Sequence, residues 1–180
     1  MLGGSTKCAC AKLASLLLLL FVLGSCGYTI VSGEKGLFQG EVVTLDVPVF
    51  KNQSFEPQIS QFFTEEFTRE LIVSGLFGVN KEGSSNTLQG TIVTTRIVPT
   101  AMSSQGLVIQ KTIYVTLGLA LSKKDGRLIK NWSMIDAEPY DVQDINLEDP
   151  NKKQALIRIA GRMSRRFSAL ILADIDRKAL

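Results

Sequence analysis

The chain has 180 residues, with 20 basic and 17 acidic side chains, three cysteines and no histidine. The lack of histidine excludes serine–histidine and cysteine–histidine catalysis and every metal site built on imidazole, and no paired carboxylate stands out in their place. The formal net charge of +3 gives no support for bulk nucleic-acid binding. We therefore expect a protein that is not an enzyme and that needs no metal or other cofactor.

The amino-terminal segment has the pattern of a bacterial secretory signal. Lys7 and Lys12 precede an apolar run from Leu13 to Leu23, and two small residues then lead to Cys26. A cysteine at that place predicts cleavage on its amino-terminal side, a diacylglycerol on its thiol, and acyl chains such as palmitate on the mature protein. More than one acyl chain is enough for stable membrane anchoring. The competing interpretation is a transmembrane helix, but the run has 11 residues and spanning takes about 20.

We divide the chain into a signal peptide (1–25), a lipidated, glycine-rich tether (26–40) and a single domain (41–180). Cleavage leaves 155 residues, in which 18 basic side chains face 17 acidic ones, a net charge of +1. Cys8 and Cys10 leave with the signal. The domain therefore has no disulfide and depends on its hydrophobic core.

The domain begins with a predicted strand over Glu41 to Phe50, followed by a helix. Alternation places one set of side chains on the buried face of the strand: Val43, Leu45, Val47 and Val49. Pro48 indicates an edge position or a bonding pattern that spares its missing N–H. After a turn over Asn52 to Glu56, Pro57 fits the first turn of a helix that ends near Ser74-Gly75. The apolar stripe of this helix is Ile59, Phe62, Phe63, Phe67 and Leu71.

Three more strands follow a polar loop at residues 80–86: Leu88–Val98, Val108–Leu121 and Arg127–Asp136, the last carrying Trp132. Gly90 marks a bulge or a close contact. The connections are a loop over Pro99 to Gly106 and a tight turn, Lys123-Lys124-Asp125-Gly126. The third strand has a buried face of Ile113, Val115, Leu117, Leu119 and Leu121. Polar strand faces carry Thr91, Thr95, Thr112, Tyr114 and Thr116.

The last predicted element is a helix that follows an acidic, irregular stretch from Glu138 to Asp149. Asp149 can cap this helix and Pro150 fits its first position. Its apolar stripe is Leu156, Ile159, Met163, Phe167, Leu170 and Ile171. The order β-α-β-β-β-α predicts an α+β two-layer sandwich, with two helices packed on one four-stranded mixed sheet. The first β-α-β unit is expected to be a right-handed parallel crossover and the later strands a meander.

Four features are candidates for binding. The hairpin tip carries Lys123, Lys124, Arg127 and Lys130, which either bind an anionic partner or protect a strand edge. The basic residues of the last helix fit a solvated face better than a phosphate-bearing lipid: Lys152, Lys153, Arg158, Arg162, Arg165 and Arg166. The loop from Pro99 to Gly106, with Met102 and the nearby Lys111, is a weaker candidate. The acidic run Asp136, Glu138, Asp141, Asp144, Glu148 and Asp149 lacks the spacing of a calcium loop, so solvation is favoured.

Several short motifs together resemble a known family. They are Cys26-Gly27-Tyr28; Val47-Pro48-Val49-Phe50-Lys51-Asn52 leading through Glu56-Pro57 into a helix; Leu88-Gln89-Gly90-Thr91-Ile92; Trp132; and the arginine-rich last helix. Their order and spacing, from Cys26 to Asp176, resemble the lipopolysaccharide-assembly lipoprotein family LptE. The resemblance implies two helices on a four-stranded mixed sheet.

The resemblance also implies a role and a location. Members of the family sit in the outer membrane of Gram-negative bacteria, lipid-anchored and facing the periplasm. They plug and help to assemble the large β-barrel that inserts lipopolysaccharide (LPS) into the outer leaflet, and they bind LPS. The nearest counterparts of their basic LPS-binding residues are Lys111, Lys123, Lys124, Arg127 and Lys130. Gly27 is not the aspartate linked to inner-membrane retention in enteric bacteria, which favours the outer membrane.

Two other functions stay open on the residues alone. A free lipoprotein that carries a lipid or glycolipid would need a sizeable apolar pocket between helices and sheet. A lipid-anchored enzyme is disfavoured by the missing histidine and by the absence of cysteine after Cys26.

Overall fold

The computed structural model describes residues 44–75, 77–79, 83–84 and 86–178, with side chains up to residue 173. The predicted signal peptide, Cys26, the tether and residues 41–43 lie outside the described residues. The described elements are β1 (Thr44–Asp46), β2 (Lys51–Asn52), α2 (Ile59–Val73), β3 (Gly78–Val79), β4 (Asn86–Met102), β5 (Val108–Lys123), β6 (Leu128–Asp141) and α3 (Ile145–Lys178). Neither described helix is long and apolar enough to cross a membrane.

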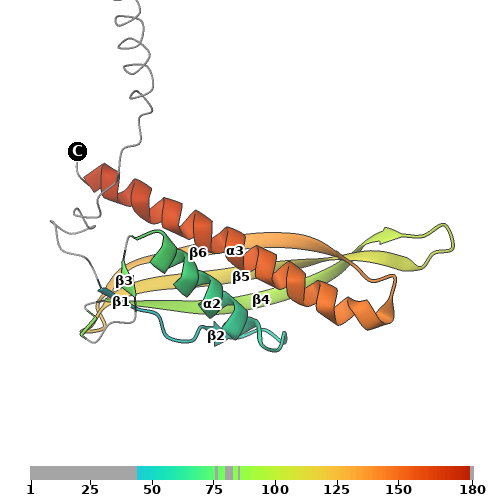
Figure 1. Ribbon diagram of the computed structural model, residues 1–180, viewed down its shortest axis with the longest axis horizontal. Coiled ribbons are helices and arrows are strands. Elements are labelled where there is room, and N and C mark those ends of the chain that lie inside the picture. Colours follow the sequence, from blue (N-terminus) through green and yellow to red (C-terminus); the bar gives the residue numbers. More distant parts are fainter. Residues whose placement is uncertain (1–43, 76, 80–82, 85, 179–180) are drawn as a thin grey trace, which may run out of the picture. The chain divides into compact units, whose positions relative to one another are not determined.

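The described elements form two layers, with α2 and α3 on the same face of one mixed sheet (Figure 1). This confirms the α+β sandwich. The strand order is β3-β1-β4-β5-β6, and β2 pairs with β4 farther along that strand. β1 and β2 run parallel to β4, as the predicted crossover requires, and β4, β5 and β6 form an antiparallel meander. The described residues form six strands and not four, because β2 follows the first predicted strand and β3 was not predicted.

The prediction of one continuous strand from Glu41 to Phe50 is wrong. Leu45 and Val47 are buried, but Val49 is 71% exposed and Phe50 is buried instead, so the alternation shifts at Pro48. Pro48 lies between β1 and β2, where its missing N–H costs no ladder bond. Among the described strands, β2 after Pro48 pairs with β4 alone, which is in line with the edge position that Pro48 indicated. The shift directs Phe50 under α2, and its N–H donates to Thr64 Oγ1 at 2.9 Å.

Gly90 in β4 makes the close contact that was one of its two predicted roles. The ring of Phe50 occupies the space that a Cβ at this position would fill. From Phe50 a row of rings crosses the core, with centroids 5.2 Å apart for Phe50–Phe67, 5.8 Å for Phe67–Phe167 and 5.1 Å for Phe167–Trp132. Aromatic pairs at such distances fill space densely and add their own attraction. The row joins the segment just before β2, both helices and β6 into one core.

The helix α2 begins two residues later than Pro57. Gln58 precedes it in the left-handed conformation, with φ of 60°, and its carbonyl accepts the N–H groups of Gln61 and Phe62. Pro57 therefore belongs to the turn and not to the first helical turn. The predicted stripe is confirmed, with Ile59, Phe63, Phe67 and Leu71 buried and Phe62 half-buried. The helix ends at Val73, and Gly75 follows with a φ of +65°, as its sequence predicted.

The strand β4 is longer than predicted. It continues through Pro99 to Met102, so the connection to β5 is only residues 103–107. Pro99 pairs with Lys111 where the register is irregular. Among the described residues this half of β4 has only β5 beside it, and an edge tolerates proline. A second irregularity, between Ile92 and Thr94, changes which face each later residue occupies. Thr95 therefore lies opposite the buried Val115 and is not on the open polar face.

The stretch predicted to be irregular after Asp136 is largely regular structure. β6 extends to Asp141, and α3 begins at Ile145. Asp144 Oδ1 accepts the N–H of Asn146 at 2.9 Å, so Asp144 and not Asp149 caps the helix. Pro150 lies inside α3 and not at its first position. The core stripe is confirmed at Leu156, Ile159, Met163, Phe167 and Ile171, whereas Leu170 is 43% exposed.

Candidate functional site

The β5–β6 turn holds most of the predicted binding residues. Gly126 donates to the carbonyl of Lys123, and Lys123 to that of Arg127, both at 2.9 Å. Asp125 Oδ1 accepts the N–H of Arg127 at 2.9 Å. Gly126 has a φ of +84°, a conformation that a side chain rarely adopts. The turn is therefore tightly specified by its sequence.

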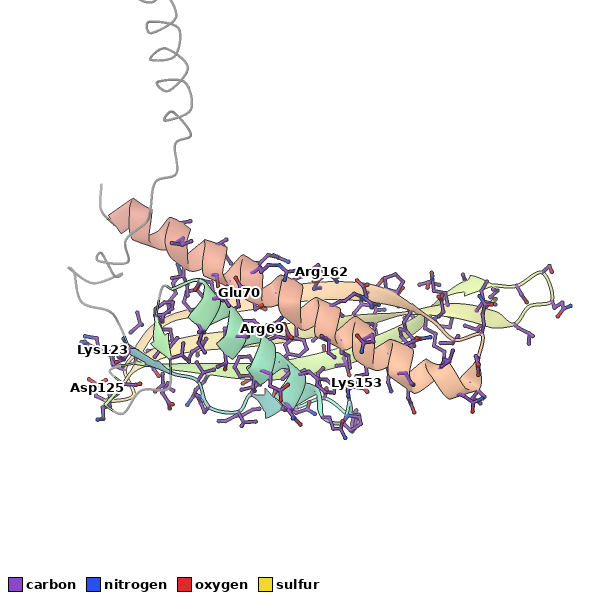
Figure 2. All side chains as sticks on the ribbon, viewed as in Figure 1. Arg69, Glu70, Lys123, Asp125, Lys153 and Arg162 are labelled. Carbon is purple, nitrogen blue, oxygen red and sulfur yellow. The ribbon has the colours of Figure 1, made fainter. Side chains whose placement is uncertain are left out.

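Four cationic side chains gather at this turn, and we call them the basic turn cluster: Lys123, Lys124, Arg127 and Lys130. All four residues are exposed. Lys130 lies over the ring of Trp132, with its Nζ 5.5 Å from the ring centroid. Figure 2 shows Lys123 and Asp125 at the end of the sheet. Exposed ammonium and guanidinium groups at one turn can bind phosphate or carboxylate groups of a partner.

Lys111, the fifth predicted binding residue, is not part of this cluster. It lies twelve positions before Lys123 on the same strand, which corresponds to roughly 40 Å of extended chain. Its Nζ is 2.6 Å from Glu148 Oε1 of α3, and both side chains are partly buried. Lys111 therefore links β5 to the start of α3, and its ammonium group already has an anionic partner in Glu148.

The arginines of α3 pair with carboxylates of β6. Arg162 Nε is 2.9 Å from Asp136 Oδ2, and its Nη1 is 2.6 Å from Glu138 Oε2. Arg158 Nε contacts the other oxygen of Glu138 at 2.6 Å. Figure 2 shows Arg162 midway along α3. These two arginines form ion pairs that link α3 to β6. The sequence had predicted either a solvated face or a phosphate-binding face, and neither prediction included this role.

The pKa values in this network follow from the pairing. Partial burial works against ionisation of Glu138, but the hydrogen bonds from Arg158 and Arg162 outweigh it, so the Glu138 pKa is lowered. The hydrogen bond to Asp136 raises the pKa of Arg162 despite its partial burial. Both residues therefore stay charged across the physiological range.

The acidic run offers no cation site in the described part of the chain, where no group of three metal-ligating side chains comes together. Asp136 and Glu138 face arginines. Asp144 caps α3, and Glu148 and Asp149 pair with Lys111 and Lys152. The carboxylates are thus used within the fold.

A small polar cluster near the start of α3 was missed by the sequence reading. Lys152 Nζ is 3.1 Å from Oε1 of the buried Glu56. Burial disfavours the charged form of Lys152, but the hydrogen bond to Glu56 outweighs it and raises the Lys152 pKa. The nearby Tyr140 hydroxyl is buried without a hydrogen-bond partner among the described residues, and burial raises its pKa. Glu56 and Lys152 are far apart in the sequence, so no local pattern identifies the pair.

The loop between β4 and β5 lies at the opposite end of the meander from the basic turn cluster (Figure 1). Its backbone closes through Ser103, whose N–H donates to the carbonyl of Leu107 at 2.8 Å. Met102 is 63% exposed, as expected, and Leu107 is 64% exposed. This end of the meander therefore exposes two apolar side chains, whereas the other end is cationic.

The comparisons with known proteins give a family and a fold. Residues 42–173 match the model of the family described as LptE, lipopolysaccharide-assembly. Searching the curated proteins found no match. A solved minor lipoprotein from Acinetobacter baumannii is similar at 10% identity and a TM-score of 0.53, covering 74% of this chain and 93% of that one.

A protein of Caulobacter crescentus CB15 that is assigned as a lipoprotein is similar to the same degree. Its identity is also 10% and its TM-score 0.53, with 71% of this chain and 91% of that chain covered. At these identities the two structures support the fold alone. The family model, by contrast, spans almost the whole described domain. The chain belongs to the LptE family of lipopolysaccharide-assembly proteins.

Proposed function

We propose that this protein is an outer-membrane lipoprotein that plugs, and helps to assemble, the β-barrel that inserts LPS into the outer leaflet. The signal peptide (1–25) is removed, Cys26 carries the lipid, the tether (26–40) leads to the domain (41–180), and the domain occupies the barrel lumen without catalysing a reaction. The observation that carries the proposal is the family match over residues 42–173.

The open face of the sheet supports a plug. Opposite the helices, β5 presents Thr112, Tyr114 and Thr116, and Arg96 of β4 lies over the Tyr114 ring at 4.7 Å. These side chains are partly exposed or exposed. Lumens of transmembrane barrels are polar and wet, so a polar sheet face suits them.

The filled core counts against the alternative of a free lipid carrier. Such a carrier needs apolar space between helices and sheet. In the described domain that space is occupied by the row of rings from Phe50 to Trp132 and by buried aliphatic side chains around it. A lipid chain would have to displace this packing.

LPS contact is proposed for the basic turn cluster, because phosphate groups of the glycolipid match its exposed cations. Replacing Lys123, Lys124 and Arg127 by glutamine is expected to weaken binding of purified LPS about tenfold or more, as three exposed cations are lost. Lys111→Gln serves as the comparison, since Lys111 is paired with Glu148. Unchanged LPS binding by the triple variant would exclude this cluster.

Depletion of the lipoprotein in its native cell tests the function itself. Loss of a plug and assembly partner is expected to lower the amount of folded LPS-transport barrel and the LPS exposed on the surface, measured by heat-modifiability of the barrel and by surface labelling. A Cys26→Ala variant, which cannot be lipidated, is expected to restore both less well than the wild-type gene. Normal barrel folding and normal surface LPS after full depletion would contradict the proposal.

A further inference from the structure

The outer edge of β6 has two halves that differ in how their backbone hydrogen-bonding groups are satisfied. β6 is the last strand in the described sheet order, and only β5 pairs with it. Beyond its end, Val142 donates to the carbonyl of Ile109 at 3.1 Å, in line with the unbroken antiparallel register of Asp141 to Lys130. Since antiparallel pairs alternate, the even-numbered residues from Lys130 onward bond to β5, and the odd-numbered residues from Asn131 to Asp141 direct their N–H and C=O groups outward.

Side chains close the half of this edge nearest to the start of α3. The carbonyl of Asp141 accepts Asn151 Nδ2 at 3.0 Å. The carbonyl of Ala137 accepts Arg162 Nη2 at 2.9 Å, and its N–H donates to Asp136 Oδ1 at 2.8 Å.

Two further residues complete the closure. Pro139, which occupies an outward position, has no N–H to offer. The carbonyl of Ile135 lies 3.5 Å from Arg166 Nη1. From Ile135 to Asp141 little of the edge is left for a neighbouring strand.

The other half of the edge is open. In the part of the chain that the structure describes, the outward backbone groups of Asn131 and Ser133 have no hydrogen-bond partner. Figure 1 shows that the carboxyl-terminal part of α3 diverges from the strands at this end. A row of unpaired N–H and C=O groups is a template for an added strand.

We propose that this open edge, Asn131 to Ser133, accepts an extended, acidic segment of the barrel partner as an additional strand. The neighbouring Lys124 and Arg127 are exposed cations, which selects for carboxylates in that segment. Leu128 and Ile135, at either end of the edge, are 56% and 63% exposed and offer apolar contacts to alternate side chains of the incoming strand. The inference rests on the proposed function.

The strand pairing within a closed barrel restricts which segment of the partner can supply the additional strand. Strands of a closed barrel wall are already paired on both sides. The added strand must therefore come from a loop or a terminal segment that enters the lumen. A second copy of this chain is disfavoured, because edge-to-edge pairing brings two basic turn clusters onto one sheet.

Hydrogen exchange on the complex purified from mildly solubilised outer membranes tests the docking. In the isolated lipoprotein the amides of Asn131 and Ser133 are expected to exchange fast, and in the complex at least tenfold more slowly, with Ala137 changing little. A barrel complex without this protection overturns the docking and leaves the proposed function standing. Recovery of no barrel overturns both. If the Asn131 and Ser133 amides of the isolated lipoprotein exchange more slowly as its concentration rises, the edge pairs with a second copy of this chain and the barrel segment is ruled out.

A proline substitution at the same edge gives a second test, read out as the amount of barrel recovered. Asn131→Pro removes an outward N–H without touching a bond to β5, as the native Pro139 already does. Loss of one backbone hydrogen bond is expected to reduce the barrel recovered per lipoprotein about fivefold. Asn131→Thr keeps the N–H and is expected to recover the wild-type amount. Wild-type recovery by a folded Asn131→Pro variant would contradict the docking.

Discussion

At the scale of single residues, the contact between Gly90 and Phe50 sets how closely β4 and the β2 segment approach. No side chain fits at Gly90, because the Phe50 ring fills its place. The ring is itself fixed by contact with Phe67 and by the bond from the Phe50 N–H to Thr64. The break of the first strand at Pro48 and the glycine in β4 are therefore two parts of one packing solution.

Gly90→Ala is expected to destabilise the domain by about 1–3 kcal/mol, because the added methyl group forces the buried ring to move. Gly118→Ala is the matched control on the neighbouring strand, where a Cβ would meet its nearest atoms at 3.8 Å, an ordinary contact. Urea denaturation of the soluble domain measures both. Equal stability of the two variants would contradict the close contact.

Glu138 is expected to contribute to the pH dependence of stability. Its pKa is lowered in the folded state, so its contribution is present above the unfolded value of about 4.3 and is lost as the pH falls through the lower, folded value. Stability should therefore decline less between about pH 5 and pH 3 in Glu138→Gln than in the wild type. Denaturation curves at several pH values measure this. An identical decline in both proteins would show that the arginine pairing has no such effect.

At the scale of elements, α3 is bound to β6 by side chains as well as by the core. Arg158 and Arg162 pair with Glu138 and Asp136, and Lys111 pairs with Glu148 near the helix start. Arg162 and Arg166 also contact outward carbonyl groups of β6, those of Ala137 and Ile135. One helix face thus fixes the helix and protects part of the sheet edge.

The start of α3 gives a direct test of its cap. Asp144→Ala is expected to cost about 1 kcal/mol, because the N–H of Asn146 loses its acceptor. Asp149→Ala is expected to change stability by less than about 0.5 kcal/mol, since its side chain is 89% exposed and paired only with Lys152. The same denaturation assay measures both variants. The reverse order would restore Asp149 as the cap.

The hydrophobic periodicity of the sequence predicts which helices and strands exist better than it predicts where each one begins and ends. The alternation in β5 and the stripes of α2 and α3 place the core almost completely, because one face of each is buried along its length. The failures lie where a distant contact decides. Phe50 leaves the alternation to contact Gly90, and β6 continues past Asp136, where arginines of α3 donate hydrogen bonds to its carboxylates.

The candidate site was predictable only where it is local. The basic turn cluster belongs to one tight turn, and the Asp125-Gly126 signal places it correctly. Lys111 lies at the far end of β5. Its pairing with Glu148 could not be predicted, because the two residues are far apart in the sequence. The open part of the β6 edge depends on where α3 leaves the sheet, which no residue pattern encodes.

At the scale of the whole molecule, the described domain combines a filled core with an open polar sheet face. A cationic turn lies at one end of the meander, and a loop flanked by the exposed Met102 and Leu107 lies at the other. Membership in the LptE family connects this arrangement to LPS assembly. A plug needs a rigid body with a polar outer face and an end that meets the anionic lipid. The described domain has the polar sheet face and the cationic turn that the proposed plug would need.

The most direct measurement is the stoichiometry of what accompanies the lipidated protein when it is isolated from mildly solubilised outer membranes and identified by mass spectrometry. A plug predicts one large β-barrel in near-equal molar amount. Recovery of the lipoprotein alone, or with lipid but without a barrel, would contradict the plug and favour a free lipid-binding lipoprotein.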